Sequence, residues 1–144
     1  MAQLKRLLPV WLLVAAVGLL SCNGNRANHL LLHKKWRVYD VQIPAGDPYD
    51  ITQVSQAVDL KKGYYSDVYY QFLDDNLFIA TIAGVPDSGK YSLLSNGSII
   101  SVTASNGLRS AEHLVSIVHL DEQLFDMKVK SGDYNFVLRT KASQ

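Results

Sequence analysis

The most regular stretch of the chain lies near its C-terminus, where residues 124–141 read LFDMKVK, SGD and YNFVLRTK in succession. In its first part, the apolar Phe125, Met127 and Val129 alternate with charged residues. A period of two is typical of a strand that packs one face on a core and exposes the other. Residues 131–133 place a glycine between two polar residues, which favours a turn. We therefore predict an antiparallel hairpin here.

The same alternation continues upstream in short segments that turn residues separate. Together with the hairpin it predicts eight strands, at residues 33–43, 68–73, 77–83, 90–95, 98–105, 113–121, 124–130 and 134–141. Asn96-Gly97 is the strongest hairpin signal in the chain, because both residues accept the positive φ of a tight turn. Residues 84–89 also read as a turn, since they hold two glycines and a proline.

Residues 50–62 interrupt this pattern with a helical one. The apolar Ile51, Val54 and Val58 recur at helical spacing, Asp50 can cap the first turn, and a glycine directly after the segment can end it. We expect a short helix or an ordered loop between the first and second strands.

A meander of eight strands leaves unpaired backbone groups on its first and last strands, and closure into a barrel removes both edges. We therefore expect an all-β fold, an eight-stranded antiparallel up-and-down barrel over residues 33–141, with a tail of residues 142–144. A two-sheet sandwich is the alternative, but it normally needs crossovers, and the loops after residue 68 are short. Side chains either fill the interior of such a barrel or line a site for one small ligand, and both outcomes stay open.

Residues 1–21 have the layout of a signal peptide. Lys5 and Arg6 precede an apolar run over residues 7–20, which is shorter than the roughly 20 residues of a membrane-spanning helix. The run ends in LLSC at residues 19–22, which contains the single cysteine of the chain. An ordinary secretory signal and an N-terminal helical anchor are the alternatives.

The LLSC sequence resembles the lipobox of bacterial lipoproteins, in which a leucine and a small residue precede an acceptor cysteine. The resemblance implies cleavage after Ser21 and attachment of acyl chains such as palmitate to Cys22. Several chains hold a protein on a bilayer durably, whereas one chain does so only reversibly. Residue 23 is not the Asp that retains some lipoproteins in the inner membrane, so we expect the periplasmic face of the outer membrane. Residues 22–32 would form a lipid-attached tether, with the three leucines at residues 30–32 packed on the domain.

A first strand with a tryptophan, a long connection and seven meandering strands resemble the lipocalin-like fold, in particular the small lipocalin-like lipoproteins of bacterial envelopes. The resemblance covers residues 33–141. It implies that an arginine late in the barrel packs over the tryptophan of the first strand, and Arg139 and Trp36 are the candidates for this cation–π pair. Lys34 stands where the family favours glycine.

Aromatic residues are the candidates for a binding site, because their rings offer flat apolar walls and tyrosine hydroxyls can orient a ligand. The residues that we expect to line a cavity are Trp36, Tyr70, Phe72, Tyr91 and Phe136. The tyrosines at residues 64, 65, 69 and 70 form either the rim of such a pocket, a docking patch, or simply a group of good strand residues.

Charge and motif content exclude several function classes. The 144 residues include 14 Lys plus Arg and 13 Asp plus Glu, for a net charge of +1. Removing Lys5 and Arg6 leaves 12 basic and 13 acidic residues, a net charge of −1, which does not favour nucleic acid as a partner. The chain contains no GxSxG, HExxH, P-loop or GxGxxG motif and no CxxC pair. We expect a protein that is not an enzyme, with no catalytic residues, no metal and no cofactor.

Two hypotheses for the function follow. In the first, the protein is a lipid-anchored envelope binding protein that holds a small apolar or amphipathic ligand in its barrel. In the second, the barrel is solid and the protein is an interaction or inhibitor lipoprotein that docks an envelope protein through its outer face and loops.

Overall fold

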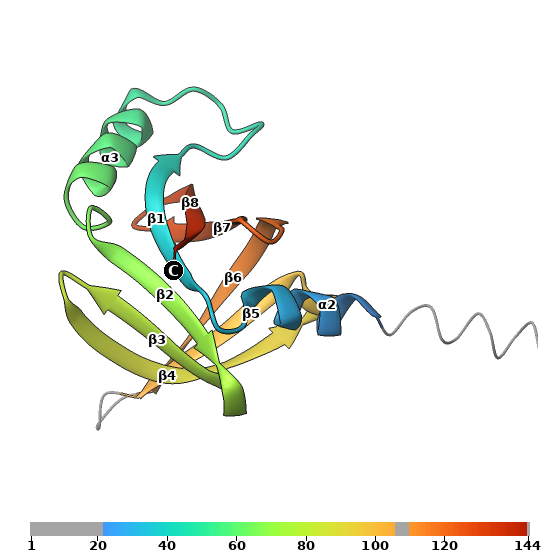
Figure 1. The fold of residues 1–144 in the computed structure, drawn as a ribbon. Coiled ribbons are helices and arrows are strands. Elements are labelled where there is room, and N and C mark those ends of the chain that lie inside the picture. Colours follow the sequence, from blue (N-terminus) through green and yellow to red (C-terminus); the bar gives the residue numbers. More distant parts are fainter. Residues whose placement is uncertain (1–21, 106–109, 144) are drawn as a thin grey trace, which may run out of the picture.

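The computed structural model describes residues 22–105 and 110–143. Eight antiparallel strands pair in chain order, and β1 also pairs with β8, which closes the barrel (Figure 1). The strands are β1 (Lys35–Gln42), β2 (Val68–Leu73), β3 (Leu77–Ile82), β4 (Val85–Leu94), β5 (Ile99–Ser105), β6 (Ser110–Leu120), β7 (Leu124–Ser131) and β8 (Tyr134–Ser143). The predicted all-β up-and-down barrel is confirmed, and it is consistent with a lipocalin-like fold.

Strand β4 begins at Val85 rather than at residue 90, so the predicted turn over residues 84–89 is wrong. The turn needs only Ala83 and Gly84, whose φ angles are 48° and 80°, as in a two-residue hairpin. Pro86 then lies inside the strand, opposite Thr81. Among the residues that the structure describes, β4 pairs with β5 only from Gly89 onward. Pro86 therefore has no described partner on that side, and proline is tolerated where its missing N–H leaves no ladder hydrogen bond unmade.

Gly89 lies where β4 and β5 pack too closely for a side chain. A Cβ at this position would stand 2.4 Å from the carbonyl oxygen of Thr103 and 3.0 Å from the Cα of Ala104. Both are backbone atoms of the paired strand, so they cannot move away without disturbing the ladder.

We expect Gly89→Ala to lower the free energy of unfolding by about 1–3 kcal/mol, as other overpacking substitutions do. Glycine-to-alanine changes at unstrained sites stabilise by about 0.4–1 kcal/mol through the unfolded chain, but here the clash outweighs that gain. Urea unfolding measures the difference, and Ser88→Ala at the neighbouring exposed residue is the control. A Gly89→Ala protein as stable as the wild type would contradict the close packing.

A helix covers one end of the barrel. Residues expected to form a tether instead form α2 (Cys22–Leu31), and Ala27, Leu30 and Leu31 are buried at helical spacing. Tyr91 donates a hydrogen bond through its hydroxyl to Oδ1 of Asn28, at 2.8 Å. The helix also packs on η3 (Ser95–Gly97), the turn between β4 and β5, in which Asn96-Gly97 forms the predicted hairpin connection. The leucines pack on the barrel as expected, but the helical conformation was not predicted.

The predicted helix after the first strand is present as α3 (Ile51–Lys62), on the upper left of Figure 1. Asp50 caps it by accepting hydrogen bonds from the N–H groups of Gln53 and Thr52. These bonds, together with one from the Tyr134 hydroxyl, hold the pKa of Asp50 below its usual value. Gln53 donates to the backbone oxygen of Asn135 at 3.0 Å, so α3 lies beside the β7–β8 hairpin. Within residues 22–105 and 110–143, neither α-helix has the length and hydrophobicity of a transmembrane segment.

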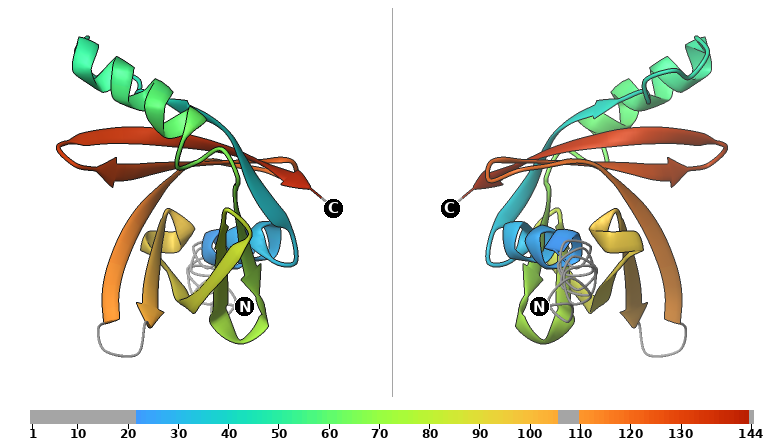
Figure 2. Two further views of the ribbon diagram at one scale, coloured as in Figure 1. Left: turned by 90° about the vertical axis from the view of Figure 1, so that its left-hand side faces the viewer. Right: turned by 90° about the vertical axis from the view of Figure 1, so that its right-hand side faces the viewer.

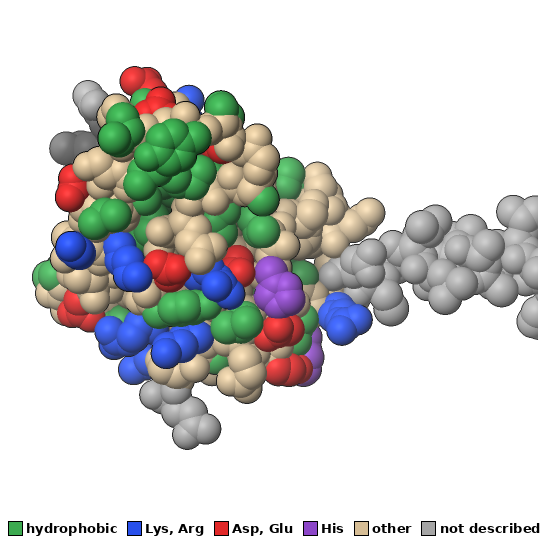
Figure 3. All heavy atoms as spheres, turned by 90° about the horizontal axis from the view of Figure 1, so that it is seen from above, with side chains coloured by type: hydrophobic (Ala, Val, Ile, Leu, Met, Phe, Trp, Pro, Cys, Tyr) green, Lys and Arg blue, Asp and Glu red, His purple; other side chains and the backbone are tan. Residues whose placement is uncertain are grey.

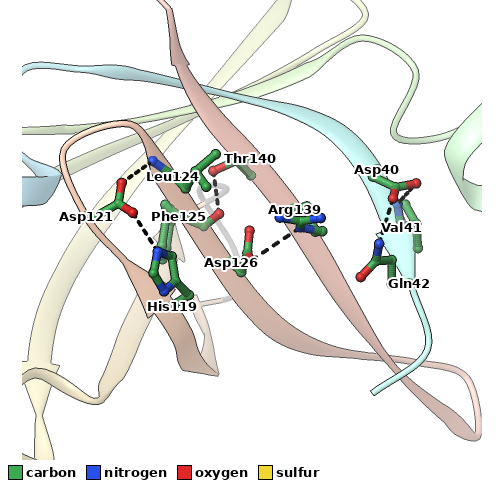
Figure 4. Close-up of polar contacts among 10 residues, drawn as sticks. All are labelled: Asp40, Val41, Gln42, His119, Asp121, Leu124, Phe125, Asp126, Arg139 and Thr140. Carbon is green, nitrogen blue, oxygen red and sulfur yellow. Dashed lines mark hydrogen bonds and ion pairs between the residues drawn. The ribbon is translucent and has the colours of Figure 1, made fainter. Parts of the chain in front are cut away.

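The turn between β6 and β7 is organised by one carboxylate, that of Asp121 (Figure 4). Its Oδ2 lies 2.6 Å from Nε2 of His119, and its Oδ1 accepts hydrogen bonds from the N–H groups of Gln123 and Leu124. The bond to His119, followed by the two backbone bonds, lowers the pKa of Asp121 to about 2. The ionised carboxylate therefore stabilises this turn.

Because the folded pKa of Asp121 lies below its ordinary value of 3.8, its contribution to stability is complete above that value and is lost as the pH falls toward about 2. We expect Asp121→Asn, which keeps the shape of the side chain but not its charge, to be less stable than the wild type at neutral pH. The gap should close between about pH 4 and pH 2. Thermal unfolding of both proteins over that range tests this, and a gap that does not vary with pH would exclude the ionised carboxylate as its cause.

Candidate functional site

The barrel encloses a cavity of about 530 Å³, a size typical of small-molecule sites. Its inner part is apolar, and the side chains of six buried or half-buried residues form most of it: Phe72, Phe78, Ile100, Val102, Phe125 and Met127. The sequence left open whether the interior is filled, and the structure shows that it is not.

A group of four aromatic rings closes the end of the cavity that α2 covers. Phe72 contacts Tyr91 and Phe125 in edge-to-face geometry, with centroids 5.0 and 6.0 Å apart, and Trp36 contacts Phe125 at 5.6 Å. The indole N–H of Trp36 donates to the backbone oxygen of Leu31 at 3.1 Å. We call these four rings the aromatic floor. Phe72 and Phe125 are on the cavity side of this floor and line the cavity. Trp36 and Tyr91 are on the other side, where their hydrogen bonds to Leu31 and Asn28 hold α2 in place.

Two tyrosines bring hydroxyl groups to the otherwise apolar wall. Tyr70 stacks on Phe78 with centroids 5.9 Å apart, and Tyr65 meets Tyr64 edge-on at 4.8 Å. Burial, with Tyr64 nearby, raises the pKa of Tyr65 to about 12, and stronger burial raises the pKa of Tyr70 further. Both hydroxyls are therefore neutral donors at physiological pH, and neither has a hydrogen-bond partner among residues 22–105 and 110–143.

The cavity opens between β6 and β7, away from α2. These strands pair only from Ser116 to Leu120 on β6, and the earlier residues of β6 separate from β7, as the left view of Figure 2 shows for the orange and red strands. Residues on both sides of this opening line the cavity, Leu114 and Val115 on β6 and Val129 on β7. Leu114 is 63% exposed, so the opening reaches solvent.

Four acidic or basic residues line the exposed parts of the cavity. Asp87, Glu112, His113 and Lys130 all line the cavity and are all exposed. The carboxylate of Glu112 accepts a hydrogen bond from the hydroxyl of Ser101 at 2.6 Å. The site thus combines an apolar interior, two hydroxyls on its wall and a charged rim.

The five residues expected to line a cavity fall into two groups. Tyr70 and Phe72 line it. Trp36, Tyr91 and Phe136 are buried in the surrounding core and are not among its lining residues. Of the tyrosine cluster, Tyr64 and Tyr65 also line the cavity, whereas Tyr69 faces the outside, beneath two basic side chains.

The expected stacking of Arg139 on Trp36 is replaced by other contacts. Arg139 lies over the ring of Tyr39, 5.4 Å from its centroid, and its Nε is 3.4 Å from Oδ2 of Asp126, a contact that Figure 4 shows. The cation near Trp36 is Lys34, at 5.4 Å. The reason is strand alternation: Leu138 and Thr140 point into the core, so the residue between them points outward.

Several wall residues were not predicted individually, namely Phe78, Ile100 and Val102. Parts of their strands have apolar residues on both faces, so the alternation of residues does not show clearly which side chains point inward. The spacing of Phe78, Ala80 and Ile82, all of which line the cavity, was the available signal. Within the described residues, no group of three or more His, Cys, Asp or Glu side chains is arranged to hold a metal ion.

Comparisons with known proteins assign no function. No family model matches the sequence, and no curated protein matches it. Among solved structures, the chain is similar to an uncharacterized protein from Bacteroides eggerthii, with 15% sequence identity and a TM-score of 0.46. The similarity covers 74% of this chain and 96% of that one.

Proposed function

We propose that the protein is a non-enzymatic binding protein that holds one small apolar or amphipathic molecule in its barrel. The observation that carries the proposal is the cavity of about 530 Å³. A barrel whose core served stability alone would gain by covering the apolar side chains that line this space, because burial of apolar surface stabilises the fold.

The distribution of polarity favours an amphipathic ligand. An alkyl chain or a ring system would contact Phe72, Ile100 and Met127, and each buried methylene would contribute about 0.8 kcal/mol. A polar group halfway along the ligand would meet the hydroxyls of Tyr65 and Tyr70. A polar or charged end would lie in the opening, where it stays hydrated beside the exposed rim.

Native mass spectrometry of the protein purified from the cells that make it tests this function. We expect a reproducible additional mass that denaturation releases. The chain with Ala80→Trp, a substitution on the cavity wall, should lose that mass. An additional mass that persists unchanged in this variant would place the ligand elsewhere.

We further propose that acylated Cys22 attaches the protein to an envelope membrane, on its periplasmic side. The support is the LLSC sequence, whose two leucines end a 14-residue apolar run. Cys22 is the first residue of α2 (Cys22–Leu31), so an anchor there would hold the α2 end of the barrel close to the bilayer. The opening between β6 and β7 lies at the other end.

Substitution of the acceptor residue tests the anchor. We expect Cys22→Ala to move the protein from the membrane fraction to the soluble or unprocessed fraction, and to abolish incorporation of labelled palmitate. Ser21→Ala, which keeps a small residue before the cysteine, is the control and should remain lipidated. Labelling that survives in Cys22→Ala would refute attachment at this residue.

A further inference from the structure

The outer face of strands β8, β1 and β2 carries a band of basic and aromatic side chains. Lys35 and Arg37 each lie over the ring of Tyr69, at 5.4 and 5.5 Å. Arg139 and Lys141 each lie over the ring of Tyr39, both at 5.4 Å. We call the four cations Lys35, Arg37, Arg139 and Lys141 the basic band.

The basic band places like charges side by side. Arg37 stands directly opposite Lys141 in the register of β1 and β8, and like charges in that position repel. Asp67 pairs with Arg37 at 2.9 Å and Asp126 with Arg139 at 3.4 Å. Lys35 and Lys141 have no carboxylate within 4 Å in the part of the chain that the structure describes. The band therefore has a surplus of positive charge, although the chain from residue 22 has a net charge of −1.

Helix α3 continues this face with apolar side chains. It buries Gln53 and Ala57 and turns the more apolar Ile51 and Val58 outward, with 72% and 44% of their surfaces exposed. Tyr49, just before the helix, is 83% exposed. We call Tyr49, Ile51 and Val58 the apolar stripe.

The basic band and the apolar stripe are parts of one surface. Lys61 in the last turn of α3 forms an ion pair with Asp40 of β1 at 2.9 Å, and Asp40 is paired in register with Arg139. Figure 3 shows green side chains of the helix region beside a group of blue Lys and Arg side chains on the same face.

We propose that this face docks on an anionic lipid bilayer. Exposed aliphatic and tyrosine side chains enter the interface between headgroups and acyl chains, while flanking lysines and arginines contact anionic headgroups. The positive surplus of the basic band is complementary to such a surface. Repulsion between Arg37 and Lys141, which face each other in the register of β1 and β8, is reduced when the phosphates of headgroups lie over them. This surface is separate from the cavity, so the proposal does not depend on the proposed ligand.

Vesicle co-sedimentation tests the docking without the acyl anchor. The protein is the chain from residue 22 with Cys22→Ser, since residues 22–143 contain the entire closed barrel and both helices. Vesicles contain equal parts phosphatidylglycerol and phosphatidylcholine, or phosphatidylcholine alone. We expect binding to the anionic vesicles only, and weaker binding as the salt concentration rises.

Two double variants separate the parts of the face. Lys35→Gln with Lys141→Gln should weaken binding about thirtyfold, because each basic residue near an anionic surface contributes about fivefold. Ile51→Gln with Val58→Gln should also weaken binding, although this variant has the same net charge as the parent protein. Arg26→Gln with Lys90→Gln, which removes two charges elsewhere, is the matched control and should bind as the parent does. Circular dichroism confirms that each variant is folded.

Three results would overturn the proposal: no binding to either vesicle, equal loss in the control variant, or capture by polyglutamate without capture by anionic vesicles. The last result would assign the face to an acidic protein instead.

Discussion

Replacement of Trp36 by alanine is expected to lower the free energy of unfolding by about 3–5 kcal/mol, the range for large aromatic residues removed from a core. Trp36 is fully buried and belongs to the aromatic floor through its edge-to-face contact with Phe125. Its N–H also satisfies the backbone oxygen of Leu31, at the last residue of α2. The substitution therefore removes packing and a hydrogen bond that holds the helix on the barrel.

Trp36→Phe separates these two effects. It keeps most of the ring packing but loses the N–H, and an unpaired buried polar group costs about 1–3 kcal/mol. Urea unfolding monitored by circular dichroism measures both variants. If Trp36→Ala cost less than Trp36→Phe, the aromatic floor would not be the main support of this end of the barrel.

Ala80→Trp is expected to weaken the binding of an apolar ligand more than a hundredfold. Ala80 lines the cavity from β3, between Tyr70 of β2 and Asp87 of β4 in the sheet register. An indole at this point would occupy space that about four ligand methylenes need, and their loss corresponds to about 3 kcal/mol. Because the added side chain enters an empty volume, the stability of the fold should change much less than the affinity.

The control for Ala80→Trp is Ser92→Trp, which adds the same side chain to an exposed position of β4. Fluorescence titration with an apolar dye, whose quantum yield rises in an apolar environment, measures the affinity of both variants. Equal affinity of the two variants for the dye would show that the dye binds outside the cavity.

The strands of this protein were predictable because their side chains alternate. Phe125 and Met127 on β7 and Phe136 and Leu138 on β8 are buried. Apart from Leu124 and Val137, their neighbours in these strands are polar or charged, so the sequence showed which side chains point inward. Strand β2 has apolar residues on both faces, and only the register showed that Phe72 points inward. The start of β4 was not predicted because Pro86 and Gly89 are ordinarily turn residues. Whether a strand accepts them depends on how the neighbouring strand pairs and packs at those positions.

The orientation of α3 could not be read from its composition. Ile51 and Val58 mark one apolar side of the helix, yet the buried residues are Gln53 and Ala57. Gln53 is placed inward by specific hydrogen bonds to Asp47 and Asn135, which no periodicity encodes. Helix propensity showed that the segment is a helix, and tertiary contacts decided which side faces the barrel.

The cavity was the least predictable feature. The presence of many large side chains does not show whether they meet at the barrel axis. The alternation of residues also does not show that β6 pairs with β7 only from Ser116 to Leu120. Only the three-dimensional structure therefore separates the aromatic residues that line the cavity from those that do not. Tyr70 faces the cavity, whereas Tyr91 packs on Phe72 at the closed end.

The most direct test of the proposed function is calorimetric titration with a series of straight-chain alcohols, each one methylene longer than the last. If the ligand lies in the apolar cavity, each methylene should lower the dissociation constant about fourfold, which corresponds to about 0.8 kcal/mol. The gain should stop when the cavity is full, and it should stop at a shorter chain in Ala80→Trp. Affinity that does not rise with chain length, or that rises identically in Ala80→Trp, would contradict a binding site inside the barrel.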